Sequence, residues 1–128
     1  MRQNHEFEEQ KAFVQYLIIR NIEHYHVPNG GSRNVREAKN LKASGVSPGV
    51  PDIHIPIQNL EYAGLFIEMK RAKPGKSTIS VEQKKWIEKL NDNGYLAVVC
   101  YGADEAIKVT EKYLESRHLW TKKPKIIC

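Results

Sequence analysis

The spacing of apolar residues along the chain predicts four helices and three strands. Apolar residues recur at three- and four-residue steps in four segments, which we expect to be helical: residues 6–24, 33–43, 80–93 and 104–116. Apolar and polar residues alternate from 53 to 57, and a second strand-like segment follows a short turn at residues 62–70. The near-continuous apolar run at residues 95–101 is typical of a buried strand. The predicted order is helix, helix, strand, strand, helix, strand, helix.

Turn-forming residues separate these elements and favour one α/β domain with a small mixed sheet. A Pro-Asn-Gly-Gly-Ser segment at residues 28–32 follows the first helix, and a glycine- and proline-rich loop at residues 45–51 precedes the first strand. The chain has 128 residues, which is the usual length of one domain. We expect a single domain over residues 1–128, with a core at about residues 5–115 and a basic C-terminal tail at residues 117–128.

Composition excludes several classes of protein. Hydrophobic residues make up 41% and charged residues 27% of the chain, which is typical of a globular protein. No run of eighteen apolar residues is present, so we expect no membrane span, and the polar N-terminus lacks the apolar stretch of a signal peptide. The 2 cysteines are too few for a disulfide framework and form no Cys-x-x-Cys pair. We therefore expect a cytoplasmic protein.

Positive charge is concentrated in two stretches. The net charge is +5, and residues 69–89 alone hold seven basic and two acidic residues. A second stretch, residues 33–42, has four basic residues and one acidic residue. Clustered positive charge attracts phosphate backbones through counterion release, although a solvated lysine surface explains charge alone equally well. The candidates for contacts with DNA phosphates are Arg33, Arg36, Lys42, Arg71, Lys73 and Lys76.

The two consecutive strands bring two acids together. A short connection makes the strands an antiparallel hairpin, and a turn centred near Leu60 pairs residues whose numbers sum to about 120. Asp52 would then lie opposite Glu68, and Lys70 would share the face of Glu68. Directly opposed side chains have Cβ atoms roughly 5 Å apart. A two-residue error in register keeps all three residues on one face, whereas a one-residue slip does not.

These three residues suit the hydrolysis of phosphodiesters. Two opposed carboxylates repel each other unless a cation lies between them, and carboxylate oxygens suit Mg²⁺ or Mn²⁺. Such an ion polarises a phosphoryl oxygen and lowers the pKa of a bound water, while Lys70 would orient the nucleophile or stabilise charge on the phosphate. The alternative is a pair of exposed strand charges in which Glu68 and Lys70 form an incidental ion pair.

The sequence also resembles a known family. The segment Val50-Pro51-Asp52 followed by Ile67-Glu68-Met69-Lys70 resembles the PD-(D/E)xK nuclease superfamily signature. A longer ordered series resembles the virus-type replication-repair nuclease (VRR-Nuc) domain over about residues 5–115. The series consists of Glu6-x-x-x-Gln10, Pro28-Asn29-Gly30-Gly31-x-Arg33, Leu41-Lys42-x-x-Gly45-Val46-x-Pro48-Gly49-Val50-Pro51-Asp52, Gly64-Leu65-Phe66-x-Glu68-x-Lys70, Ser80-x-x-Gln83 and Gly94-Tyr95. The resemblance implies a restriction-endonuclease-like domain with about four strands flanked by helices.

The resemblance also implies roles for individual residues. Asp52 and Glu68 would bind Mg²⁺ or Mn²⁺, with the backbone carbonyl of Met69 as a further ligand, and Lys70 would be the catalytic lysine. Gln83 would reach the site from the following helix. An alternative for Gln83 is a capping box with Ser80, in which its side chain only satisfies a backbone amide.

The sequence does not decide the roles of several other candidate residues. Glu6 would be an outer or second-metal ligand from the first helix, with Glu9 as its competitor and a solvated acid at a helix start as the alternative. His54 shares the catalytic face by alternation, although a lone histidine there is more often a neighbour than a ligand. His24 and His26 flank the first turn, where we expect packing or hydrogen bonding only.

The leading functional hypothesis is a metal-dependent DNA endonuclease. Stand-alone members of the family resemble junction resolvases, which implies a dimer that acts on branched or four-way-junction DNA. A compact chain of this kind also suits a phage or prophage gene. We therefore expect it in a bacterial or phage-infected cell. Two alternatives stay open: an exonuclease or restriction-type enzyme on the same scaffold, and a DNA-binding module without catalysis.

Overall fold

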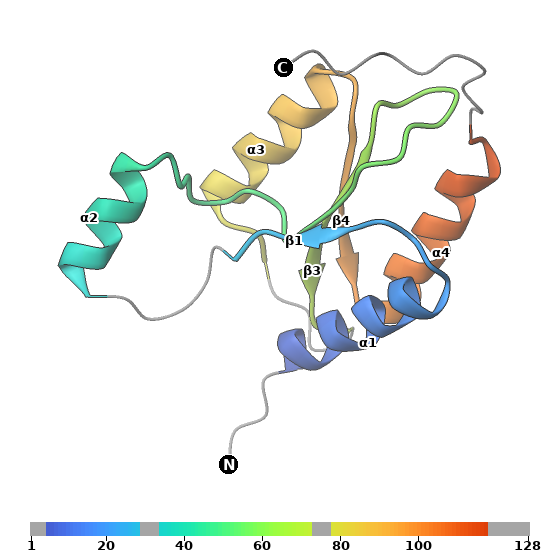
Figure 1. The fold of residues 1–128 in the computed structure, drawn as a ribbon, viewed down its shortest axis with the longest axis horizontal. Helices are drawn as coiled ribbons and strands as arrows, with labels where there is room; N and C mark the ends of the chain where they lie inside the picture. Colours follow the sequence, from blue (N-terminus) through green and yellow to red (C-terminus); the bar gives the residue numbers. More distant parts are fainter. Residues whose placement is uncertain (1–4, 29–33, 73–77, 118–128) are drawn as a thin grey trace.

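The computed structural model describes residues 5–28, 34–72 and 78–117 and contains a four-stranded mixed sheet (Figure 1). The strand order is β1-β2-β3-β4, with antiparallel pairing of β1 to β2 and β2 to β3 and parallel pairing of β3 to β4. The strands are β1 (Tyr25–His26), β2 (Ile53–Ile55), β3 (Leu65–Lys70) and β4 (Leu96–Tyr101). The helices are α1 (His5–Ile19), α2 (Val35–Ala43), α3 (Val81–Asp92) and α4 (Ala103–Glu115). No helix of the described residues is long and apolar enough to cross a membrane.

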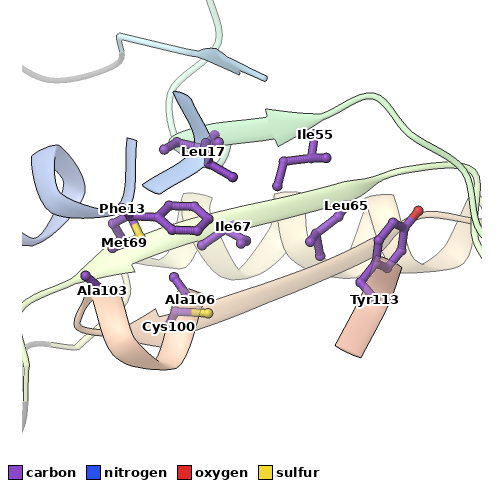
Figure 2. Packing of buried hydrophobic residues seen from close by; sticks show 11 residues of the cluster. Phe13, Leu17, Ile55, Leu65, Ile67, Met69, Cys100, Ala103, Ala106 and Tyr113 are labelled. Atoms are coloured by element: carbon purple, nitrogen blue, oxygen red, sulfur yellow. The ribbon is translucent and has the colours of Figure 1, made fainter. Parts of the chain in front are cut away.

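The hydrophobic core lies between the sheet and two helices. Alternate residues of β2 and β3 point to one face, where α1 and α4 cover them, and Figure 2 shows α3 on the opposite face. Because Leu65, Ile67 and Met69 all point into this core, Phe66, Glu68 and Lys70 point to the face that α3 flanks. Core side chains include Phe13, Leu17, Ile53, Ile55, Leu65, Ile67, Met69, Cys100, Ala106 and Tyr113.

The predicted pairing of the hairpin is confirmed. Ile53 pairs with Ile67 and His54 with Phe66, so the numbers of paired residues sum to 120. Both strands are shorter than predicted, because the chain turns around the buried Asn59 instead of continuing to pair. The side chain of Asn59 accepts hydrogen bonds from the backbone of Glu61 and Tyr62 and donates one to the backbone of Tyr113 in α4.

The first helix is shorter than predicted. It ends at Ile19 rather than near residue 24, because Asn21 adopts the left-handed conformation, with a φ of 56°. The N–H of Asn21 then bonds to the carbonyl of Ile18, and the N–H of Ile22 bonds to that of Leu17, which is the Schellman arrangement. The early end releases Tyr25 and His26 to form β1, a strand that the sequence pattern did not predict.

The loop before β2 packs against the start of α3. Gly49 has a φ of +89°, and a Cβ placed on it would lie 2.5 Å from the backbone carbonyl carbon of Glu82. Only glycine permits this approach without moving the helix. The indole N–H of Trp86 also bonds to the hydroxyl of Ser47, at 3.3 Å. These contacts place the glycine- and proline-rich loop, and therefore Asp52, beside α3.

Helix α2 stands apart from the other elements (Figure 1). Among the described residues it contacts no other helix or strand, and none of its side chains is buried. Asn34 caps its start by accepting a hydrogen bond from the N–H of Glu37, at 2.8 Å. The helix lies in the connection between β1 and β2, which leads into Asp52.

Candidate active site

Three acids from distant parts of the sequence meet at one end of the sheet. Glu6 lies in the first turn of α1, Asp52 directly precedes β2, and Glu68 lies in β3. Each offers a carboxylate oxygen, and these three oxygens all lie within 4.8 Å of one another. We call Glu6, Asp52 and Glu68 the acid cluster.

Asp52 is held at both its side chain and its backbone. Its Oδ2 accepts a hydrogen bond from the N–H of Met69, at 2.8 Å, where the β2–β3 pairing ends. Its carbonyl oxygen accepts one from the N–H of Val27, at 2.7 Å, and lies 2.8 Å from Nδ1 of His26. The same Nδ1 lies 3.0 Å from the side-chain amide nitrogen of Gln10. Strand β1 therefore fixes the position of the acid on the neighbouring strand.

Glu68 is a buried acid with little compensation for its charge. It is 2% exposed, and its Oε2 lies 3.8 Å from Nζ of Lys70, which is also buried. Burial raises the pKa of Glu68 to about 9, and Asp52 adds to the rise through its charge and a hydrogen bond, against an opposing effect of Lys70. Burial and the charge of Asp52 therefore favour the protonated form of Glu68.

Gln83 both caps α3 and contacts Glu68. Its side-chain oxygen Oε1 accepts a hydrogen bond from the backbone N–H of Ser80, at 2.8 Å. Its backbone N–H donates one to the Ser80 hydroxyl, at 3.1 Å. Its amide nitrogen lies 3.0 Å from Oε2 of Glu68. Because the capping contact requires the oxygen to face Ser80, the NH₂ group must face Glu68. Gln83 therefore completes the capping box and also reaches Glu68, while a part in catalysis stays a prediction.

The structure separates Glu6 from Glu9. Glu6 belongs to the acid cluster, whereas Oε1 of Glu9 accepts a hydrogen bond from the N–H of Ala103, at 3.1 Å. Ala103 is the first residue of α4, whose N-cap Gly102 provides no side chain to bond its amides. A carboxylate at this position satisfies a free N–H and complements the helix dipole. Glu9 thus caps a neighbouring helix from a distance of 94 residues in the sequence.

The acid cluster fits a divalent cation. Three carboxylates supply the hard oxygen ligands that Mg²⁺ and Mn²⁺ prefer, and Lys70 offsets only one of their negative charges. A cation binds the deprotonated carboxylate, so it would replace the proton that burial and Asp52 favour on Glu68. The backbone carbonyl of Met69 as a further ligand stays a prediction.

Three of the predicted DNA contacts lie on described parts of the chain. Arg36 and Lys42 are exposed on α2, and Arg71 is exposed directly after Lys70. Arg71 lines a cavity of about 360 Å³ together with His5, Glu8, Glu9 and Ala72. Arg33, Lys73, Lys76, the turn at residues 29–31 and most of the C-terminal tail lie outside the described residues.

His54 lies outside the acid cluster, and the residues around it were not anticipated. Its ring stacks on Phe66, and its Nδ1 lies 2.6 Å from the hydroxyl of Tyr25. Neither Tyr25 nor His26 was predicted to act at the site, since a strand of two residues is too short to produce a periodic pattern. His24 bonds to the carbonyl of Ile22, so for this residue the expectation of local hydrogen bonding is confirmed.

Comparison with known proteins supports a nuclease-type domain. The sequence matches the VRR-NUC domain family over residues 20–104. A solved structure named "VRR_NUC domain protein" is similar, with a TM-score of 0.77 and 30% sequence identity, over 91% of this chain and 93% of that one. Among curated proteins, none matches the sequence. The matched region includes Asp52, Glu68, Lys70 and Gln83, while Glu6 precedes it.

Proposed function

The chain belongs to the VRR-NUC domain family, whose members are nuclease-type DNA-processing domains, and from this premise we propose that it is a Mg²⁺- or Mn²⁺-dependent DNA endonuclease. The observation that carries the proposal is the meeting of Glu6, Asp52 and Glu68 within 4.8 Å beside a buried lysine. An acid cluster of this kind is destabilising without a cation. In the sequence, the exposed Arg71 directly follows Lys70, and the basic helix α2 ends shortly before Asp52.

Each residue of the site has a distinct task in this proposal. The acid cluster would hold the cation, and the Met69 N–H and strand β1 would keep Asp52 in place. When bound, Mg²⁺ or Mn²⁺ supplies a Lewis acid for the phosphoryl oxygen and lowers the pKa of water. Lys70 would orient the nucleophile or stabilise negative charge that develops on the phosphate. Gln83 would hold the Glu68 carboxylate in a single orientation by donating to Oε2.

The basic residues favour selection by DNA shape. Arg36, Lys39 and Lys42 project on α2, where they can contact phosphates, and phosphate contacts position a protein on DNA without reading its sequence. We therefore propose branched DNA, including four-way junctions, as the preferred substrate. A two-fold homodimer would present two acid clusters to the symmetric strands of such a junction.

Cleavage assays test this proposal. Labelled duplex, single-stranded, flap and four-way-junction DNA would be incubated with Mg²⁺, Mn²⁺ or EDTA, and a closed circle would distinguish endonuclease from exonuclease activity. We expect metal-dependent cutting, strongest on a branched substrate, and a loss of about a hundredfold or more in Asp52→Asn. Asp92→Asn, the same change at an exposed acid at the end of α3, is the matched control and should cut like wild type.

Two results would contradict the proposal. Cutting that persists in EDTA, or equally in Asp52→Asn, would separate the activity from the acid cluster. Tight DNA binding without cutting under either metal would show a DNA-binding module without catalysis.

A further inference from the structure

A row of aromatic side chains crosses the sheet beside the acid cluster. Tyr25, His54 and Phe66 are directly opposed on β1, β2 and β3. The Tyr25 and His54 rings meet edge to face with centroids 5.0 Å apart, and the His54 ring lies flat on Phe66 at 4.0 Å. Tyr95 closes the far end of the row, with its ring perpendicular to that of Phe66 and the two centroids 5.3 Å apart. We call these four residues the aromatic row; the activity proposed above does not use it.

The aromatic row runs next to the acid cluster on the same face of the sheet. His54 is two residues from Asp52, and Phe66 is two residues from Glu68, so side-chain alternation puts both pairs on one face. Two residues along a strand span about 7 Å. The aromatic row is therefore within reach of the nucleotide next to a phosphate held at the acid cluster.

One end of the row is open to solvent. Tyr25 is 51% exposed, whereas Phe66 at the centre of the row is 8% exposed. The Tyr25 hydroxyl is tied to Nδ1 of His54, at 2.6 Å. The other ring nitrogen of His54, Nε2, is buried and has no hydrogen-bond partner among the described residues. An orphaned buried nitrogen costs stability, so packing alone accounts poorly for a histidine here. Its contacts instead hold the Tyr25 ring in a fixed orientation, while about half of the residue stays exposed.

We propose that Tyr25, held by His54, stacks on an unpaired DNA base adjacent to the scissile phosphate. In a duplex each base face is covered by its neighbours, so only an unpaired or extruded base can stack on a protein ring. The substrate class is therefore DNA with an unpaired nucleotide at the cleavage point, as in a flap, a bubble or an open junction. This inference rests on the proposed function, because it places the ring beside the phosphate that the acid cluster would hold.

Binding measured in EDTA tests the stacking independently of cleavage. A single abasic nucleotide would be moved along the unpaired strand of a fixed flap DNA, and the Kd of wild type measured at each position. We expect a weakening of about tenfold at one position. Tyr25→Leu should lose this dependence and Tyr25→Phe should keep it. Tyr62→Leu, which removes a tyrosine ring from the β2–β3 connection instead, should behave as wild type.

A second measurement requires no variant. 2-Aminopurine placed at the sensitive position should be quenched when wild type binds, because stacking on an aromatic ring quenches its fluorescence. No sensitive position in wild type, an unchanged dependence in Tyr25→Leu, or no quenching would overturn the inference.

Cleavage of the same DNA with Mn²⁺ places the base relative to the acid cluster. The sensitive nucleotide should lie next to the mapped cut, and a position several nucleotides away would refute the proposed geometry. Metal-dependent cutting without a sensitive position would refute the stacking alone. A sensitive position that depends on Tyr25, in a protein that cuts nothing, would support the stacking and refute the proposed function.

Discussion

At the scale of single residues, Glu68 carries the main energetic conflict of the fold. It is buried between Asp52 and Lys70, and its pKa rises to about 9 because burial disfavours the charged form. In the unfolded chain the same acid loses its proton near its ordinary pKa of 4.5. Between these two values the folded protein binds one more proton than the unfolded chain, so this group makes stability fall as the pH rises.

Replacing Glu68 by Gln should therefore remove this pH dependence in the absence of metal. The free energy of unfolding of wild type in EDTA should decrease between pH 5 and pH 8, by at most about 1.4 kcal/mol per pH unit from this group. Glu68→Gln should show a flatter profile and higher stability at pH 8, while losing nuclease activity. Urea denaturation at several pH values measures both, with Glu88→Gln on the exposed side of α3 as the control. Equal slopes in wild type and Glu68→Gln would show that Glu68 ionises normally.

At the scale of elements, the start of α3 is connected to strand β3 through one side chain. Gln83 completes a capping box with Ser80 and at the same time donates to Glu68. Gly49 brings the preceding loop against the same helical turn. The first turn of α3 thus helps to hold the acid cluster in place. Mutation can separate the capping role of Gln83 from its contact with Glu68.

Gln83→Glu should preserve the cap and impair the site. Glutamate also completes a capping box, but it would place a carboxylate where an NH₂ donor now meets Glu68. We expect stability near that of wild type and cleavage reduced by about tenfold or more. Ser80→Ala should do the reverse, with a loss of about 1 kcal/mol of stability and nearly full cleavage. Thermal unfolding and initial cleavage rates measure the two effects. Full activity in Gln83→Glu would leave Gln83 with a capping role only.

At the scale of the whole molecule, the acid cluster joins three parts of the fold. Glu6 comes from α1, Asp52 from the start of β2 and Glu68 from β3, and they converge only in the folded chain. A cation bound by all three would therefore bind the folded state and not the unfolded chain, which stabilises the fold by mass action.

Adding Mn²⁺ should raise the melting temperature of wild type. At a free concentration about 100 times the Kd, the stabilisation should be about 2.7 kcal/mol. The increase should be larger at pH 8 than at pH 5.5, because the cation competes with the proton that Glu68 retains. Asp52→Asn should lose most of the increase, while Asp92→Asn should keep it. An equal increase in all three proteins would indicate metal binding elsewhere.

Much of this arrangement could be predicted from local patterns in the sequence. The spacing of apolar residues identified the four helices and the three longer strands, and alternation placed Glu68 and Lys70 on one face. The short connection between β2 and β3 predicted their register, which the pairing of Ile53 with Ile67 confirms. These features are predictable because helix and strand periods, and the pairing of two strands that follow each other closely in the sequence, depend on few residues.

Only the tertiary structure decided which distant segments meet. Glu6 and Glu9 are both acids in the first turns of α1, and the packing of α1 against α4 assigns one to the acid cluster and the other to the start of α4. Strand β1 forms because Asn21 ends α1 early and β2 offers a free edge. This strand supplies the hydrogen bonds that hold the backbone of Asp52, and it carries the half-exposed Tyr25. Sequence periodicity records which side of an element is buried; it contains no information on which element lies opposite, because that depends on how all the elements pack at once.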